Sequence, residues 1–322
     1  MPGDGEADRA LGHPDPFTGS GARSASRTRR RTGRRPRPGP VSRLPGNRNL
    51  LSIVARRVIF IHCPKTGGTT LGDVLRRQYG AERVRWVDGY KLEAEAEALA
   101  ALPEPALAAV DAFCGHMPVG LGELLACPCT YITLLRDPVE RIVSHYHWVL
   151  RTPSARLHAE VVSRRMTLRR YVEESSGARF FNNGQTRVLG ATSMVADTPA
   201  TQATLDAAKK NLERFGVVGL AERFDESLLL MRRELGWHWP VYRPLKVSVG
   251  RPHAPDLADE DREAIVARNL LDADLHDHVS RSLEERVERL RPELDRDLIV
   301  VRELNRAQAI AALEQESHGR AA

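Results

Sequence analysis

A short apolar run, a glycine-containing loop and a helical pattern follow one another at residues 58–78, and this order narrows the fold more than any other part of the chain. Val58–Ile61 is a β-branched and aromatic run typical of a buried strand, and Pro64 ends it. Apolar residues then recur with helical spacing over Leu71–Gln78. The segment therefore predicts a strand, a tight loop and a helix.

The loop has the composition of an anion-binding site. Gly67 and Gly68 allow the backbone to approach a ligand closely, and free N–H groups at the start of a helix attract an anion. Lys65 adds a positive charge, and three threonines add hydroxyl groups. The sequence therefore predicts a phosphate cradle. Its predicted members are Lys65, Thr66, Gly67, Gly68, Thr69 and Thr70.

The position of the lysine separates this loop from the common nucleotide cradle, in which the lysine follows the last glycine. Lys65 precedes both glycines. Pro-Lys-Thr-Gly-Gly-Thr-Thr resembles the 5′-phosphosulfate loop of carbohydrate sulfotransferases, the type that includes heparan sulfate 2-O- and 6-O-sulfotransferases. The resemblance implies that 3′-phosphoadenosine 5′-phosphosulfate (PAPS) is the donor. It also implies that Lys65 neutralises the bridging oxygen while backbone N–H groups hold the 5′-phosphate.

Three further apolar runs predict strands at residues 110–114, 131–135 and 216–220, with helical patterns between them at 91–110, 138–150 and 205–214. Strands that alternate with helices predict an α/β fold, here a P-loop-like one with a central parallel sheet covered on both faces. In such sheets ligands bind at the carboxyl ends of the strands. Lys65, His116 and Arg136 each follow or end a predicted strand, so we expect them at one edge.

The remaining pattern is mostly helical. A helix is predicted at residues 226–235, and from Asp259 onward the pattern is helical with an interruption near Pro292. Residues 180–187 read as a polar loop, and residues 313–322 are expected to fray.

A second motif follows the strand predicted at residues 131–135. Asp137 is placed to cap the next helix, with Pro138 as its first residue and Glu140 as capping-box partner. Arg136 and Ser144 could then face one phosphate, the arginine through its fork and the serine through its hydroxyl. The spacing resembles the 3′-phosphate site of sulfotransferases, about 70 residues after Lys65.

His116 is the predicted general base. It stands in Phe-Cys-Gly-His-Met, which resembles the Gly-His segment that carries the base in 2-O-sulfotransferases, and a histidine suits proton transfer near pH 7. A histidine at a strand end is more often structural, and His62 is the competing candidate. His145 and His147 are expected to be surface or packing residues.

Two later segments carry weaker matches. Asn183-Gly-Gln-Thr-Arg187 resembles a segment of the same sulfotransferases, which places Asn183, Gln185 and Arg187 near the acceptor or the nucleotide. Residues 246–251 occupy the place of the loop that covers the nucleotide, with Ser248 and Arg251 as candidate contacts.

Composition divides the chain into three parts. Residues 1–50 contain eleven arginines against four acidic residues and are predicted to be a disordered tail with a net charge of +7. Since the whole chain has a net charge of +6, the remaining residues have a net charge of −1. Residues 51–312 are predicted to be one sulfotransferase domain. No run reaches the roughly 18 apolar residues of a membrane span, and the N-terminus lacks the apolar core of a secretory signal. These features predict a soluble, cytoplasmic protein. The animal enzymes that the chain resembles carry an N-terminal membrane anchor, and this departure implies a bacterial enzyme. Four cysteines in a chain of this length make no disulfide framework, so they are expected to be reduced.

The sequence thus predicts a PAPS-dependent sulfotransferase that acts on a hydroxyl of a saccharide or glycoconjugate, without a metal and with a histidine base. One alternative is a P-loop kinase, which the order of lysine and glycines disfavours. The other is a non-catalytic nucleic-acid-binding protein that uses the arginine-rich tail. The identity of the acceptor and the oligomeric state do not follow from the sequence.

Overall fold

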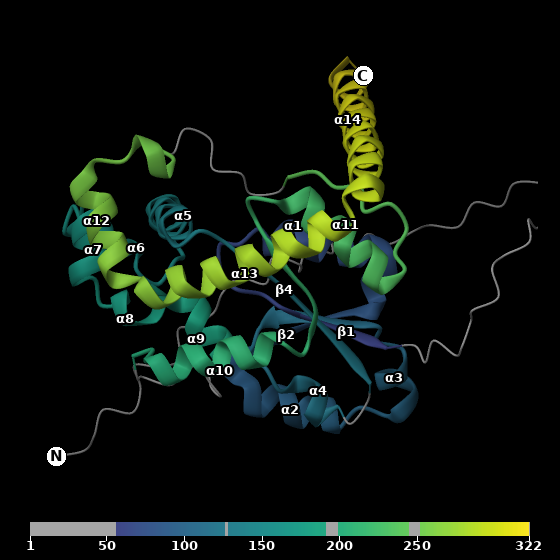
Figure 1. The fold of residues 1–322 in the computed structure, drawn as a ribbon, viewed down its shortest axis with the longest axis horizontal. Helices are drawn as coiled ribbons and strands as arrows, with labels where there is room; N and C mark the ends of the chain where they lie inside the picture. Colours follow the sequence, from purple (N-terminus) through teal and green to yellow (C-terminus); the bar gives the residue numbers. More distant parts are fainter. Residues whose placement is uncertain (1–55, 126–127, 191–198, 245–251, 322) are drawn as a thin grey trace, which may run out of the picture. The chain divides into compact units, whose positions relative to one another are not determined.

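A five-stranded parallel sheet forms the centre of the computed structural model, which describes residues 56–125, 128–190, 199–244 and 252–321 (Figure 1). The strands are β1 (Arg57–Ile61), β2 (Val84–Asp88), β3 (Ala112–His116), β4 (Cys129–Leu135) and β5 (Phe215–Leu220). They lie in the order β2-β3-β1-β4-β5, and each neighbouring pair is parallel. The predicted α/β fold with a central parallel sheet is confirmed.

Helices cover both faces of the sheet. In Figure 1, α1 and α11 lie above the strands, and α2, α4 and α10 lie below them. The helices are α1 (Gly68–Tyr79), α2 (Leu92–Ala100), α3 (Glu104–Ala108), α4 (Leu121–Leu124), α5 (Pro138–Arg151), α6 (His158–Ser163), α7 (Leu168–Glu174), α8 (Ala178–Phe181), α9 (Gly184–Gly190), α10 (Gln202–Leu212), α11 (Phe224–Leu235), α12 (Asp259–Arg268), α13 (Leu270–Arg289) and α14 (Arg291–Ala321).

The sequence prediction differs from the structure in two places that matter for the site. Val84–Asp88 forms the edge strand β2, which was not predicted. The segment predicted as a polar loop at residues 180–187 instead contains the end of α8 and the start of α9. Helix α14 continues through residues 313–321, so the fraying expected there remains a prediction.

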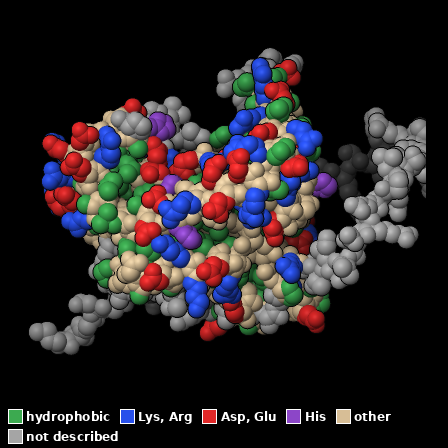
Figure 2. All heavy atoms as spheres, viewed as in Figure 1, with side chains coloured by type: hydrophobic (Ala, Val, Ile, Leu, Met, Phe, Trp, Pro, Cys, Tyr) green, Lys and Arg blue, Asp and Glu red, His purple; other side chains and the backbone are tan. Residues whose placement is uncertain are grey.

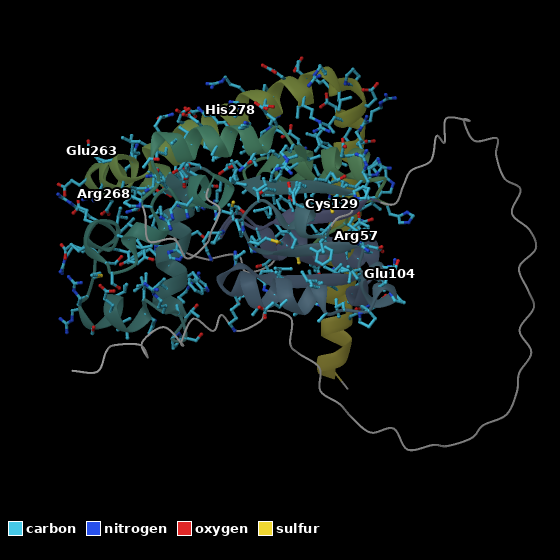
Figure 3. All side chains as sticks on the ribbon, turned by 90° about the horizontal axis from the view of Figure 1, so that it is seen from below. Arg57, Glu104, Cys129, Glu263, Arg268 and His278 are labelled. Carbon is cyan, nitrogen blue, oxygen red and sulfur yellow. The ribbon has the colours of Figure 1, made fainter. Side chains whose placement is uncertain are left out.

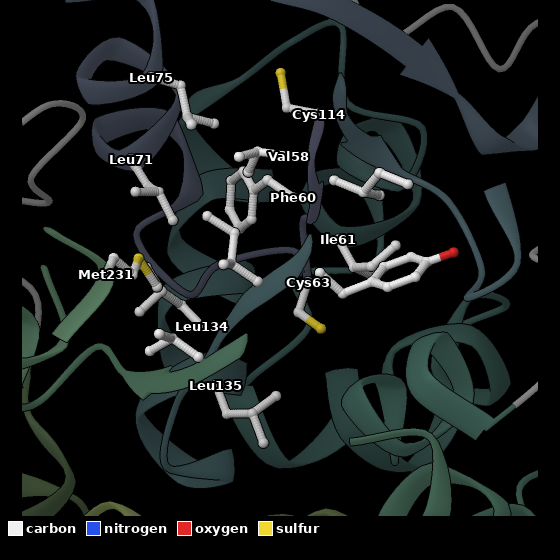
Figure 4. Close-up of a cluster of buried hydrophobic side chains, with 14 of the residues drawn as sticks. Val58, Phe60, Ile61, Cys63, Leu71, Leu75, Cys114, Leu134, Leu135 and Met231 are labelled. Atoms are coloured by element: carbon white, nitrogen blue, oxygen red, sulfur yellow. The ribbon is translucent and has the colours of Figure 1, made fainter. Parts of the chain in front are cut away.

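The central strand β1 is buried from Val58 to Ile61. Figure 4 shows Leu71 and Leu75 of α1 with Met231 of α11 on one side of Phe60, and Ile61 on the other. Side chains of this strand therefore pack on both of its faces, and the apolar area removed from water is the main stabilising contribution at the centre of the domain.

The amino end of β1 is tied to neighbouring segments away from the predicted site. Arg57 donates hydrogen bonds to the carbonyl oxygens of Leu107 and Val110, at 3.1 and 3.2 Å. Figure 3 labels Arg57 beside Cys129, its register partner at the start of β4. The polar loops with Lys65 and Arg136 lie at the opposite, carboxyl ends of β1 and β4.

Candidate active site

The loop after β1 has the backbone geometry of a tight cradle. Gly67, the residue before α1, has a φ of 84°, and Lys65 has a φ of 72°. Both values lie in the left-handed region, which a lysine adopts only when its surroundings hold it there. The first turn of α1 carries no acidic side chain. Its N–H groups therefore meet an approaching anion without a competing carboxylate.

The threonines of the cradle differ in their surroundings. Thr66 is fully buried and donates its hydroxyl proton to the carbonyl oxygen of Cys63 at 2.8 Å, so it shapes the loop itself. Thr70 is 5% exposed, whereas Thr69 is half-buried. Thr69 is accordingly the most accessible of the three hydroxyl groups.

Gly68 is required because a histidine ring packs against its Cα. A Cβ built at Gly68 would lie 1.9 Å from the His62 ring, a distance at which no side chain can be accommodated. The start of α1 thus packs against His62, the residue directly after β1.

His62 and His116 form a stacked pair. Their ring centroids lie 4.5 Å apart with an angle of 24° between the planes. Trp86 of β2 meets both rings edge-on, at 6.1 Å from His62 and 5.4 Å from His116. The structure therefore brings together the two histidines that the sequence offered as alternatives for the base.

One hydrogen bond fixes the proton on the His116 ring. Its Nδ1 lies 2.8 Å from the carbonyl oxygen of His62, and a carbonyl oxygen can only accept. Nδ1 is therefore the donor, and Nε2 of a neutral His116 keeps its lone pair. That arrangement suits a general base.

The lysine of the cradle contacts the segment that carries the second predicted phosphate motif. Its Nζ is 5.4 Å from the centroid of the Trp148 ring, which α5 provides. Its carbonyl oxygen accepts a hydrogen bond from the Arg136 guanidinium at 3.3 Å. The two motifs, 71 residues apart in sequence, are thus in direct contact.

Arg136 is held by its own helix as well. Its guanidinium donates to Glu140 Oε2 at 3.0 Å, and both side chains are less than one fifth exposed. Ser144 lies two turns into α5 and is 7% exposed. The guanidinium is thus oriented before a ligand arrives, which reduces the entropy cost of binding one.

The predicted cap of α5 is half right. Asp137 accepts a hydrogen bond from the N–H of Glu140 at 2.9 Å, as expected for an N-cap. The prediction that Glu140 completes a capping box is wrong: the N–H of Asp137 donates to Glu222 Oε1 at 2.6 Å. The Glu140 carboxylate instead bonds Arg136 and, at 2.8 Å, the N–H of Ala254.

Glu222 follows β5 and remains ionised. Burial raises its pKa, but the ion pair with His276, whose Nε2 lies 3.7 Å from Glu222 Oε2, and the hydrogen bond from the N–H of Asp137 outweigh burial and leave the pKa below its ordinary value. Burial lowers the pKa of His276, yet its interaction with the Glu222 carboxylate raises the pKa overall. A negative charge therefore stands at the amino end of α5, where the helix dipole favours it.

Cys63 contributes no nucleophile. Burial raises the pKa of its thiol to about 12. The thiol is therefore protonated at neutral pH and acts as a packing group.

The other predicted residues divide into two groups. Asn183, Gln185 and Arg187 lie in or beside α9, and Gln185 and Arg187 are buried among protein groups. Gln185 bonds the main chain of Arg136, whereas the Asn183 side chain accepts from the N–H groups of Leu271 and Asp272. Ser248 and Arg251 lie outside the described residues.

Three residues at the site were missed from the sequence. Trp86 could have been found from the alternation of Val84 and Trp86, a strand signal. Trp148 lies about three turns along α5 from Arg136, and only the fold shows that Lys65 reaches it. Glu222 gives no local signal, because its partner Asp137 is 85 residues away.

Neither a metal centre nor a membrane span is found in the described part of the chain. Within it, no three His, Cys, Asp or Glu side chains are grouped so as to hold a metal ion. None of its helices has the length and apolar character needed to cross a bilayer.

Comparison with known proteins agrees with the motifs. The mouse (Mus musculus) galactosylceramide sulfotransferase is 27% identical over 283 residues, which is 83% of this chain and 66% of that protein. The bovine (Bos taurus) galactose-3-O-sulfotransferase 3 is 28% identical over 176 residues, 52% of this chain and 40% of that protein. The chain thus spans about two thirds or less of the length of these relatives.

A solved structure, mouse sulfotransferase SULT7A1 complexed with PAP, overlaps 79% of this chain and 89% of its own chain, with 15% identity and a TM-score of 0.32. The description of the matching family is galactose-3-O-sulfotransferase, and the match covers residues 40–322. Because this match takes in most of the sequence, the chain belongs to the galactose-3-O-sulfotransferase family.

Proposed function

We propose that this protein transfers the sulfuryl group of PAPS to a hydroxyl of a galactose-containing saccharide or glycolipid. The observation that carries the proposal is the contact between the Arg136 guanidinium and the carbonyl oxygen of Lys65. It joins a cradle suited to a 5′-phosphosulfate with an arginine suited to a 3′-phosphate. Only a nucleotide with both groups would use the two motifs together.

The transfer needs a base, an in-line path and neutralisation of the leaving group. The acceptor oxygen attacks sulfur, and the bond between sulfur and the bridging oxygen breaks. His116 Nε2 takes the hydroxyl proton, and the electron pair of the broken bond stays on the phosphate of the departing 3′-phosphoadenosine 5′-phosphate. Lys65 and the N–H groups at the start of α1 stabilise the charge that develops there.

The galactose part of the proposal comes from the family and from the names of the relatives, which include galactosylceramide and galactose-3-O-sulfotransferases. The test is a transfer assay with PAPS and paired acceptors, galactosylceramide beside glucosylceramide and a galactose-terminated oligosaccharide beside its glucose counterpart. Sulfate found on the galactose 3-hydroxyl supports the proposal. Sulfate transfer to neither galactose acceptor, with a functional donor site, would reject it.

Two other functions are less well supported. The lysine-before-glycine order disfavours a kinase. On the face that Figure 2 shows, basic and acidic side chains are interspersed rather than gathered into a basic patch, so this face gives no support to nucleic-acid binding. A cytoplasmic location and a bacterial origin remain predictions from the sequence.

A further inference from the structure

A single glutamine side chain holds the main chain of Arg136. Gln185 Oε1 accepts from the N–H of Arg136 at 2.8 Å, and Gln185 Nε2 donates to the carbonyl oxygen of the same residue, also at 2.8 Å. Arg136 comes directly after β4, so the amide satisfies both backbone groups of the first residue beyond the strand. A carboxamide suits this pairing because its oxygen accepts while its nitrogen donates, without a change of protonation state.

A buried carboxylate fixes the position of Gln185. Asp272 of α13 accepts from the N–H of Gln185 at 3.2 Å and from the N–H of Thr186 at 2.8 Å, which satisfies the start of α9. It is paired with Arg141 of α5 at 3.1 Å. Asp272, Arg141 and Gln185 are each no more than 2% exposed, so the network is inaccessible to water and to ligands.

A side chain beside or within each of the helices α9 and α13 accepts hydrogen bonds from the N–H groups at the start of the other helix. While Asp272 binds the first N–H groups of α9, the Asn183 side chain accepts from the N–H groups of Leu271 and Asp272 at the start of α13. The N–H of Asn183 donates to Asn269 Oδ1 at 2.9 Å. The two helix starts therefore hold each other, and Gln185 projects from this junction to Arg136.

We propose that Gln185 is a positioning residue for recognition of the 3′-phosphate. It fixes the Arg136 main chain, while Lys65 and Glu140 orient the guanidinium. This assignment rests on the proposed function, because it takes Arg136 as the 3′-phosphate contact. It gives the buried Gln185 a role through Arg136 rather than through direct contact with the acceptor or the nucleotide.

The test compares 3′-phosphoadenosine 5′-phosphate with AMP, which lacks only the 3′-phosphate. In Gln185→Met, an uncharged side chain of similar length replaces the amide and both hydrogen bonds are lost. We expect the affinity for 3′-phosphoadenosine 5′-phosphate to fall roughly tenfold, with the affinity for AMP unchanged. In an Arg136→Ala background, Gln185→Met should cause no further loss, because the two residues act through one contact. Titration calorimetry of the unmodified protein, the two single variants and the double variant gives the affinity of each for both nucleotides.

Gln202→Met is the matched control, since Gln202 is exposed on α10 and bonds only Asp206 of the same helix among the contacts described. If Gln185→Met does not fold, Gln185→Asn keeps a buried amide that is one methylene too short to reach Arg136. An equal loss for both nucleotides, or additive losses with Arg136→Ala, would overturn the positioning role. A wild-type protein without preference for the 3′-phosphorylated nucleotide would instead reject the donor site itself.

Discussion

Replacing Lys65 by alanine is expected to abolish measurable sulfuryl transfer, with a fall in kcat of at least about 100-fold. The proposed mechanism places the leaving phosphate at the cradle beside this ammonium group, so the charge that develops as the bond to sulfur breaks would lose its stabilising partner. The affinity for the donor should also fall, because the same charge binds the phosphosulfate in the ground state. Steady-state kinetics with PAPS and calorimetry with the desulfated nucleotide measure the two effects separately.

Lys210→Ala is the control for Lys65→Ala. Lys210 is exposed in the last turn of α10, so its substitution removes one positive charge away from the site. Its kcat should equal that of the unmodified enzyme. Transfer that persists in Lys65→Ala at more than about one tenth of the original rate would contradict the role of Lys65 in leaving-group stabilisation.

Replacing His116 by alanine is expected to lower kcat by about 100-fold or more while the affinity for the donor stays nearly the same. The reason is that the proposed mechanism gives Nε2 the acceptor proton, whereas it assigns the phosphate contacts to the loop after β1, the start of α1 and Arg136. The measurement is kcat beside the dissociation constant for 3′-phosphoadenosine 5′-phosphate. A variant with both values unchanged would move the base to another residue, and His62 is the first to examine.

His238→Ala serves as the control for His116. His238 is exposed after α11, and its described hydrogen bond uses the backbone N–H, at 3.0 Å from Gln78. Loss of donor affinity in His116→Ala but not in His238→Ala would show that the histidine stack supports the cradle through His62. That result would replace the base assignment by a structural one.

The parts of the site that were predictable are local in sequence. Val58–Ile61, the glycine pair and the helix after it lie within 20 residues, so periodicity and turn chemistry specify them. The positions of Arg136 and Ser144 were predictable for the same reason, because one follows the end of β4 and the other lies on the helix that Asp137 caps. Their role at the 3′-phosphate stays a prediction. Parallel strands then bring the two motifs to one edge, as the fold class requires.

The parts that were not predictable depend on contacts between distant segments. The capping-box prediction failed because the Glu140 carboxylate bonds Ala254, 114 residues away, while Glu222 takes its place at Asp137. Residues 180–187 were predicted to form a loop because their side chains are polar. In the structure those side chains form hydrogen bonds with the main chain of α13 and of Arg136, and neither partner is near in sequence. Strand β2 was missed because charged Arg85 and Asp88 interrupt a short edge strand.

The most direct test of the donor site is a thermal-shift titration of the purified full chain with 3′-phosphoadenosine 5′-phosphate, beside ADP and ATP with Mg²⁺. At about 100 times its dissociation constant, a ligand of the folded state adds about 2.7 kcal/mol to the free energy of unfolding. For a domain of this size that free energy raises the midpoint by several degrees. The proposed site predicts a shift with the 3′-phosphorylated nucleotide and none of comparable size with ADP or ATP. A shift with ATP alone, or with none of the three, would contradict the assignment of Arg136 and Ser144, and with it the sulfuryl-transfer function.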